Sequence, residues 1–261
     1  MGVVQTDKWL NKLYDKPVEL CKKLSEYFNG IDSSIIRTHL IQHGMYQHPT
    51  ANGKKWVSQL QKNGVWTSVA KEAIALKQLW NGPDIPIFIL PADSTNQHLK
   101  QDHNGKSGLA FNDKLFLFVS KYNTSKEISA LFTHEYHHVC RLSKFQKSEA
   151  DYVLLDTIIL EGLAENAVRE RLGEHYVAPW TTYYTTDELE AMWNEIIVPK
   201  HKIPRFLRQH HDLLFGIRAY PKMVGYCVGY YLVKKYMEEN NLTSSDIIDT
   251  PSEDIARMNH S

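Results

Sequence analysis

The stretch THEYHHVC, residues 133–140, places three histidines and a glutamate within five consecutive positions. On an α-helix, residues four apart lie on the same face, so His134 and His138 are spaced to offer two imidazoles to one metal ion. Glu135 lies between them and can face the ion without binding it. This is the H-E-x-x-H arrangement, in which zinc binds both histidines and the glutamate acts as a general base. The stretch therefore predicts a catalytic zinc site on a helix.

His137 allows a second pairing, because it is three residues from His134 and on a similar side of the helix. That pairing leaves no carboxylate in position to act as a base, so the sequence favours His134 with His138. His137 is then expected at the margin of the site or in ordinary packing. The remaining alternative for the whole cluster is a hydrated helix face without a metal ion.

A catalytic zinc usually has three protein ligands and an exchangeable water molecule. In the metzincin pattern, a glycine three residues after His138 and a histidine six residues after it would supply the third ligand. Arg141 and Lys144 occupy those positions and exclude that pattern. The other common source is a glutamate on the next helix, and Glu161 opens the stretch EGLAE there. Glu161 is therefore the expected third ligand.

The surroundings of Glu161 support this assignment. Glu161 follows the apolar run LLDTIIL, and a buried glutamate without a partner is costly, whereas a metal ion would supply the partner. Glu165 lies one turn later and could accept the ring N–H of a ligand histidine, which would fix its tautomer. The plain alternative is a helix with two hydrated acids.

The patterns around this stretch predict an α+β fold that is predominantly helical. Apolar and β-branched runs at 84–93 and 114–120 predict strands of a small antiparallel or mixed sheet before the H-E-x-x-H helix. Thr124 and Glu127 fit a capping box, which predicts the start of that helix. Helical patterns occupy six further stretches, at 6–29, 32–43, 56–80, 148–171, 185–199 and 222–240.

The bulk composition limits the possible partners and location. The chain has 261 residues with 30 acidic and 30 basic side chains, so it has no overall field that would attract nucleic acid. No apolar stretch reaches the length of a membrane span. The three cysteines are few and far apart, which favours a reducing compartment. We therefore expect a cytoplasmic protein without a membrane span.

Three stretches carry a resemblance to a known family: HEYHH at 134–138, EGLAE at 161–165 and GYCVGY at 225–230. Together they resemble the glutamate-ligand, thermolysin-type zincins, and they are similar to the bacterial YjaZ-like family of predicted zinc-dependent proteases. The resemblance implies one Zn²⁺ ion, a peptide or protein substrate, and peptide hydrolysis with Glu135 as the general base.

The resemblance also implies a zincin-like fold. We expect a helical N-terminal region at residues 1–82 and a metallopeptidase region at 83–261. Within the second region, residues 83–145 would hold the strands and the H-E-x-x-H helix, and residues 146–261 would be helical.

Two further features of the superfamily can be sought here. An edge strand before the H-E-x-x-H helix binds the substrate backbone by strand addition, and the matching segment is SGLAFND, around Ala110 and Phe111. A tyrosine or histidine usually completes the oxyanion site, and we expect Tyr226 to do so. The alternative for Tyr226 is an aromatic ring in ordinary packing, and His210 and His211 are other candidates.

The glycines beside Tyr226 predict a close helix contact, because Gly225 and Gly229 are four residues apart.

Three functions remain open from the sequence. The first is a zinc metallopeptidase, either an endopeptidase or an exopeptidase. The second is a metal-binding or peptide-binding protein that is catalytically inactive. The third is a hydrolase of a non-peptide amide, since peptide deformylases use a similar helix. Glu135 favours catalysis, because a structural zinc site needs ligands and no base. The oligomeric state is not indicated.

Overall fold

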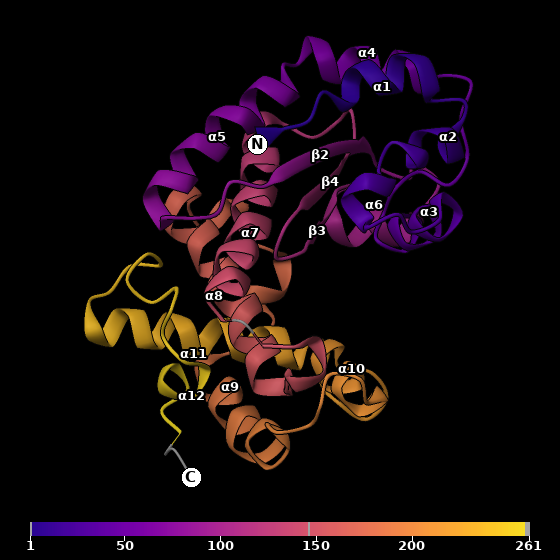
Figure 1. The fold of residues 1–261 in the computed structure, drawn as a ribbon. Helices are drawn as coiled ribbons and strands as arrows, with labels where there is room; N and C mark the ends of the chain where they lie inside the picture. Colours follow the sequence, from indigo (N-terminus) through magenta and orange to yellow (C-terminus); the bar gives the residue numbers. More distant parts are fainter. Residues whose placement is uncertain (1, 146, 259–261) are drawn as a thin grey trace. The chain divides into compact units, whose positions relative to one another are not determined.

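The computed structural model describes residues 2–145 and 147–258 and confirms a predominantly helical fold with a small mixed sheet. The chain forms two compact units, Met1–Val139 and Cys140–Ser261 (Figure 1). The division into domains after residue 82 stays a prediction. Every helix among the described residues is too short or too polar to cross a bilayer.

The first unit contains the sheet, in the order β1-β2-β4-β3. Its strands are β1 (Gly2–Val3), β2 (Pro86–Pro91), β3 (Ser107–Ala110) and β4 (Leu115–Val119). β1, β2 and β4 are parallel, whereas β3 is antiparallel to β4 and forms an edge of the sheet. All residues of β2 and β4 are buried. Such continuous apolar strands indicate that side chains cover both faces of the sheet.

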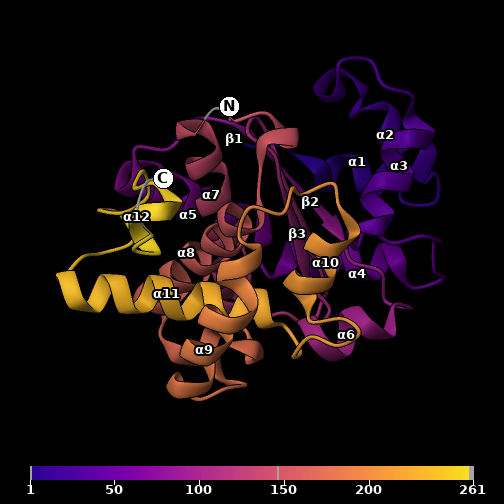
Figure 2. The same cartoon turned by 90° about the horizontal axis from the view of Figure 1, so that it is seen from below.

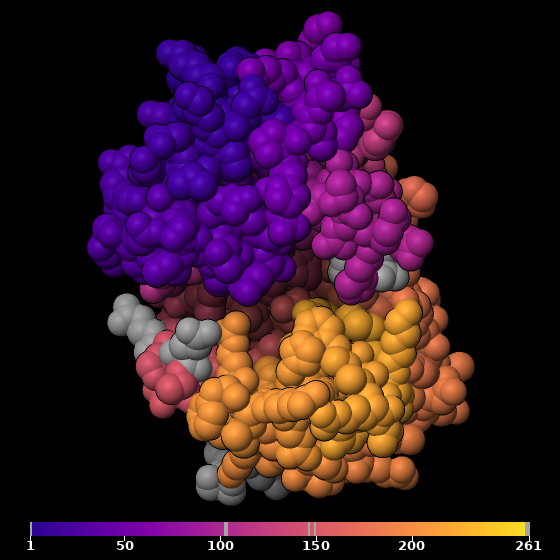
Figure 3. All heavy atoms as spheres, turned by 90° about the vertical axis from the view of Figure 1, so that its right-hand side faces the viewer, coloured from indigo at the N-terminus to yellow at the C-terminus, as the bar shows by residue number. Residues whose placement is uncertain are grey.

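One face of the sheet packs against helices that lie between β1 and β2 in the sequence. Phe88 of β2 stacks on Phe116 of β4, with ring centroids 4.7 Å apart, and Tyr27 meets Phe88 edge-on. The helices of this layer are α1 (Thr6–Leu13), α2 (Pro17–Lys22) and α3 (Ser33–Gln42). Figure 3 shows part of their outer surface in indigo and purple. The helical pattern at 6–29 is divided because Pro17 starts a new helix, which proline favours at its first position.

Three more helices lie in this unit. They are α4 (Gly53–Lys62), α5 (Val65–Trp80) and α6 (Gln97–His103). The pattern at 56–80 was expected to be one helix, but Gly64 divides it by adopting a left-handed backbone, with φ +66°. α5 packs beside α7 (Ser125–Lys144), where Ser129 Oγ donates to Glu72 Oε1 at 3.1 Å. The last residues of α7 belong to the second unit.

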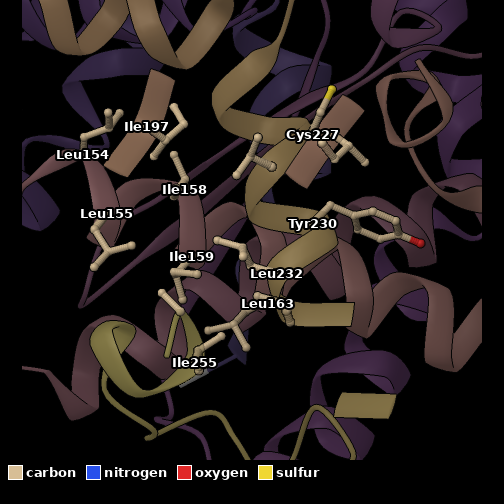
Figure 4. Close-up of a cluster of buried hydrophobic side chains, with 14 of the residues drawn as sticks. Leu154, Leu155, Ile158, Ile159, Leu163, Ile197, Cys227, Tyr230, Leu232 and Ile255 are labelled. Atoms are coloured by element: carbon tan, nitrogen blue, oxygen red, sulfur yellow. The ribbon is translucent and has the colours of Figure 1, made fainter. Parts of the chain in front are cut away.

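The second unit is built around two long helices, α8 (Leu154–Leu172) and α11 (Val224–Asn240). α11 lies across α8 (Figure 2), and Figure 4 shows the apolar side chains that both helices contribute to the core. The shorter helices are α9 (Thr186–Met192), α10 (Arg208–Phe215) and α12 (Ser252–Ile255). α9 begins at a capping box formed by Thr185 and Glu188.

The backbones of α8 and α11 approach closely at two glycines. A methyl group added to Gly229 would lie 1.9 Å from the carbonyl oxygen of Ile158, and one added to Gly162 would lie 2.2 Å from that of Gly229. Asn166 is fully buried and donates to the carbonyl oxygens of Gly162 and Tyr230, at 2.8 and 3.1 Å. The predicted close contact at Gly229 is therefore confirmed.

The three cysteines are buried thiols. Burial raises the pKa of Cys21 to about 11 and that of Cys227 to about 12. The Cys227 thiol also donates to the carbonyl oxygen of Trp180 at 3.1 Å.

Candidate metal centre

Helix α7 begins at the predicted capping box. The N–H of Thr124 donates to Glu127 Oε2 at 2.7 Å, and the N–H of Glu127 donates to Thr124 Oγ1 at 3.3 Å. These two bonds satisfy backbone donors that would otherwise lack helical partners. The cap fixes the start of α7, and the helix then runs through the whole H-E-x-x-H stretch.

His134 and His138 lie one above the other on α7. Their ring centroids are 4.6 Å apart and their planes are nearly perpendicular, at 86°. His134 is half-buried, whereas His138 and Glu135 are buried, with 7% and 9% of their surface exposed. The spacing that the sequence suggested therefore places both imidazoles on one side of the helix.

Glu161 of α8 completes a group that could hold a metal ion. His134, His138 and Glu161 each offer one ligand atom, and these three atoms lie within 4.8 Å of one another. Two imidazole nitrogens and one carboxylate oxygen form a donor set typical of catalytic zinc, which keeps a further position for water. The residues present thus fit the ion that the sequence suggested.

His137 packs away from this group. Its side chain is fully buried, and its ring meets the Trp80 ring of α5 edge-on, with centroids 5.0 Å apart. This is the ordinary packing that was one of its two expected roles.

Glu165 is buried, and one of its carboxylate oxygens accepts the backbone N–H of Ala178. This contact holds the carboxylate in the interior of the second unit. The suggested bond from a ligand histidine to Glu165 stays a prediction.

Sequence reasoning missed the close contact between Gly108 of β3 and Glu135 of α7. A methyl group added to Gly108 would lie 2.2 Å from Cγ and 2.3 Å from Cδ of Glu135. The Glu135 side chain therefore packs directly against the backbone of the edge strand β3 at Gly108. The available signal was a glycine inside a strand pattern, which often marks a close approach of another group.

Hydrogen bonding along β3 determines which backbone groups face the sheet edge. The N–H of Phe111 donates to the carbonyl oxygen of Lys114 at 2.9 Å, across the turn between β3 and β4. Because pairing alternates along an antiparallel strand, Leu109 should pair with β4, and the N–H and C=O groups of Gly108 and Ala110 should point away from it.

Phe111 has a different environment from Ala110. Its ring packs edge-on against Phe28, with centroids 5.7 Å apart, and belongs to the apolar cluster beneath the N-terminal helices.

Tyr226 of α11 is half-buried among aromatic rings. Its ring centroid lies 5.3 Å from that of Trp180 and 5.4 Å from that of Phe215. This arrangement is compatible with ordinary packing and with a donor role, so its oxyanion role stays a prediction.

His210 of α10 lies beside the face of α8 that carries Glu161. His210 Nε2 is 3.0 Å from Oγ1 of Thr157, which precedes Glu161 by about one turn. Burial, with the positive charge of Arg205 and the nearby His211, lowers the pKa of His210 to about 4. His210 is therefore neutral at physiological pH. His210 is buried, whereas the neighbouring His211 is exposed.

Comparison with known proteins gives a consistent picture. A family model described as "Predicted Zn-dependent protease (DUF2268)" matches residues 65–257, a region that includes α7 and α8. YjaZ of Bacillus subtilis (strain 168), described as an uncharacterized protein, is 43% identical over 256 residues, covering 97% of each chain. YjfC of the same strain, also described as uncharacterized, is 25% identical over 174 residues, covering 64% of this chain and 58% of YjfC. The chain therefore belongs to this family of predicted zinc-dependent proteases.

Proposed function

We propose that the protein is a thermolysin-type zinc peptidase in which His134, His138 and Glu161 hold one zinc ion. The observation that carries this proposal is the cluster of two imidazoles and a carboxylate, with ligand atoms within 4.8 Å of one another. A zinc ion held there would polarise the substrate carbonyl and make a bound water molecule more acidic. The substrate would be a peptide or protein, in keeping with the family description.

Glu135 would act as the general base of this reaction. It would take a proton from the attacking water and pass it to the departing amine. Its place one residue after His134 supports the role, since a metal site without catalysis has no need of a base there. The contact with Gly108 would keep the carboxylate in a single position.

The edge strand β3 would bind the substrate backbone by strand addition. Gly108 and Ala110 are suited to this role because their backbone groups point away from β4. Phe111 is better explained as a packing residue, since its ring is occupied by contacts with the N-terminal helices. A peptide paired with β3 would run past Glu135, because Glu135 rests on the same strand.

Two further residues would support the reaction. Glu165 would orient a ligand histidine, and its replacement by glutamine should weaken zinc affinity by about 10–100-fold. Tyr226 would donate its hydroxyl proton in a hydrogen bond to the oxyanion, and Tyr226→Phe should lower kcat by about 100-fold or more. Tyr230→Phe is the matched control. The Tyr230 hydroxyl is buried and neither accepts nor donates a hydrogen bond within the described residues.

The test compares the wild-type protein with Glu135→Gln. Purified wild-type protein should contain stoichiometric zinc and cleave an unstructured protein such as casein. Glu135→Gln should retain zinc and lose about 100-fold or more of the activity. Wild-type protein that binds no zinc would exclude the metal site. Equal cleavage by both proteins would exclude the role of Glu135, and zinc binding without any cleavage would identify an inactive binding protein.

A further inference from the structure

Helix α10 and its flanks carry several large apolar side chains on the surface. Phe206 is 73% exposed and Leu207 44%, just before the helix, and Phe215 at its end is 37% exposed. Single exposed apolar residues are ordinary on soluble proteins, but a cluster of them commonly marks a binding surface.

The same stretch is basic, although the whole chain is electrically balanced. Its exposed cations include Lys202, Arg208 and Lys222. Asp212 is the only acidic residue between positions 200 and 222, and it is buried with an ion pair to Arg218 at 3.0 Å. A ligand at this surface would therefore meet positive charge and apolar rings together.

Helix α10 presents its two sides to different surroundings. His210 faces α8, where it contacts Thr157. Arg208, His211 and Phe215 are exposed, and their spacing of three and four residues places them along one side of the helix. Lys222 lies beside the end of this helix, because the N–H of the next residue, Met223, donates to the carbonyl oxygen of Phe215 at 2.9 Å. We call Phe206, Leu207, Arg208, His211, Phe215 and Lys222 the α10 surface.

A continuous row of rings joins the α10 surface to Tyr226. The ring centroids of His211 and Phe215 are 4.6 Å apart, those of Phe215 and Tyr226 are 5.4 Å apart, and Tyr226 continues to Trp180 at 5.3 Å. A group bound on Phe215 would thus lie next to the tyrosine that we expect at the oxyanion.

We propose that the α10 surface binds the part of a peptide substrate that flanks the scissile bond, and selects segments that combine apolar with acidic side chains. The inference rests on the proposed peptidase function. The rings would take the apolar side chains, and Arg208 with Lys222 would attract the carboxylates. The ring row to Tyr226 and the contact of α10 with α8 favour a substrate over a bilayer as the occupant.

The experiment measures binding to the full-length Glu135→Gln protein, so that it needs no turnover. The probes are two fluorescent unstructured peptides of equal length, in which phenylalanine and leucine are interspersed either with glutamate or with lysine. The acidic peptide should bind about tenfold more tightly at low salt, and the difference should shrink at high salt.

Variants then locate this preference on the α10 surface. Arg208→Glu combined with Lys222→Glu should abolish or reverse the preference for the acidic peptide. Arg208→Lys, which keeps the positive charge, should preserve that preference. Phe206→Ser combined with Phe215→Ser should weaken the binding of both peptides about tenfold. Lys55→Glu and Ile35→Ser change exposed residues of the first unit and should leave both affinities unchanged. Thermal melts establish that each variant is folded.

Equal affinity for the two peptides would overturn the proposal, as would a preference that survives in the folded Arg208→Glu and Lys222→Glu protein. Binding to vesicles containing phosphatidylglycerol, with no peptide binding, would also overturn it and identify a membrane surface. If the Glu135→Gln protein binds the acidic peptide selectively but the wild-type protein does not cleave casein, peptide binding by the α10 surface is supported and the peptidase function is excluded.

Discussion

Gly108 and Glu135 are in contact although they belong to different elements, and this contact leads to a first prediction. Gly108→Ala should displace the Glu135 carboxylate, because the new methyl group would lie within 2.5 Å of three of its atoms. Peptide cleavage should fall by about 100-fold, whereas zinc content should stay the same, since neither residue is a ligand. Casein cleavage and metal analysis of the same preparation measure both quantities.

The control for that prediction is Gly64→Ala. Gly64 has a left-handed backbone, with φ +66°, and open space around it, so alanine there costs about 1 kcal/mol of stability without touching Glu135. Loss of activity in both variants would show that destabilisation alone is responsible.

His210 provides a second prediction, which concerns pH. Its pKa is lowered from 6.5 to about 4 in the folded protein. Between these two pH values, His210 binds a proton in the unfolded chain and stays neutral in the folded protein. The contribution of neutral His210 to the free energy of unfolding is therefore fully present above pH 6.5 and is lost as the pH falls towards 4. The loss should be about 2 kcal/mol after allowance for solvent screening.

Urea unfolding at several pH values between 7 and 4 measures this loss. His210→Gln should reduce the dependence of the unfolding free energy on pH in that range, and the exposed His48→Gln should not. An unchanged pH dependence in His210→Gln would contradict the assignment.

The residues that could be predicted from the sequence are those whose geometry is local. His134 and His138 are related by one turn of one helix, so their spacing alone indicated a shared ligand position. Gly108 could not be predicted as a partner of Glu135, because their contact depends on how the sheet and α7 pack.

Helices α8 and α11 cross with almost no space between their backbones, which gives a prediction at the scale of elements. Gly229→Ala would place a methyl group 1.9 Å from the carbonyl oxygen of Ile158 and force the helices apart. The variant should lose about 2–3 kcal/mol of stability. Zinc affinity should also fall, because Glu161 lies on α8 one turn from this crossing.

Denaturant unfolding and zinc titration test the two effects separately. Gly173→Ala is the control: it also introduces strain, at φ +89°, but meets no atom within 4 Å. It should lower stability and leave zinc affinity unchanged. Unaltered zinc affinity in folded Gly229→Ala would show that the crossing does not position Glu161.

Periodicity predicted where helices occur more reliably than where they end. The patterns at 6–29 and 56–80 kept their apolar spacing across Pro17 and Gly64, yet both helices break there. Proline lacks a backbone donor and glycine readily adopts a left-handed conformation, so these local effects outweighed the apolar pattern. α10 was not predicted, because its eight residues are too few for a clear period.

Metal removal gives a prediction for the whole molecule. Zinc that binds the folded chain and not the unfolded chain should stabilise it by about 2.7 kcal/mol at a concentration 100 times Kd. A chelator should therefore lower the Tm of the wild-type protein, and added zinc should restore it. Glu161→Gln should show a smaller response, whereas Glu195→Gln, at an exposed position, should respond like the wild type. An equal response in Glu161→Gln would remove Glu161 from the ligand set.

The buried cysteines have a practical consequence for experiments on the whole chain. Cys21, Cys140 and Cys227 are all shielded from solvent, and the raised pKa values of Cys21 and Cys227 keep those two thiols protonated. The three native thiols should therefore react slowly with maleimides. A cysteine introduced at exposed Gln209, next to the α10 surface, should then be labelled selectively in an otherwise native chain. A fluorophore at that position would report the arrival of a peptide in real time, without a cleavage assay.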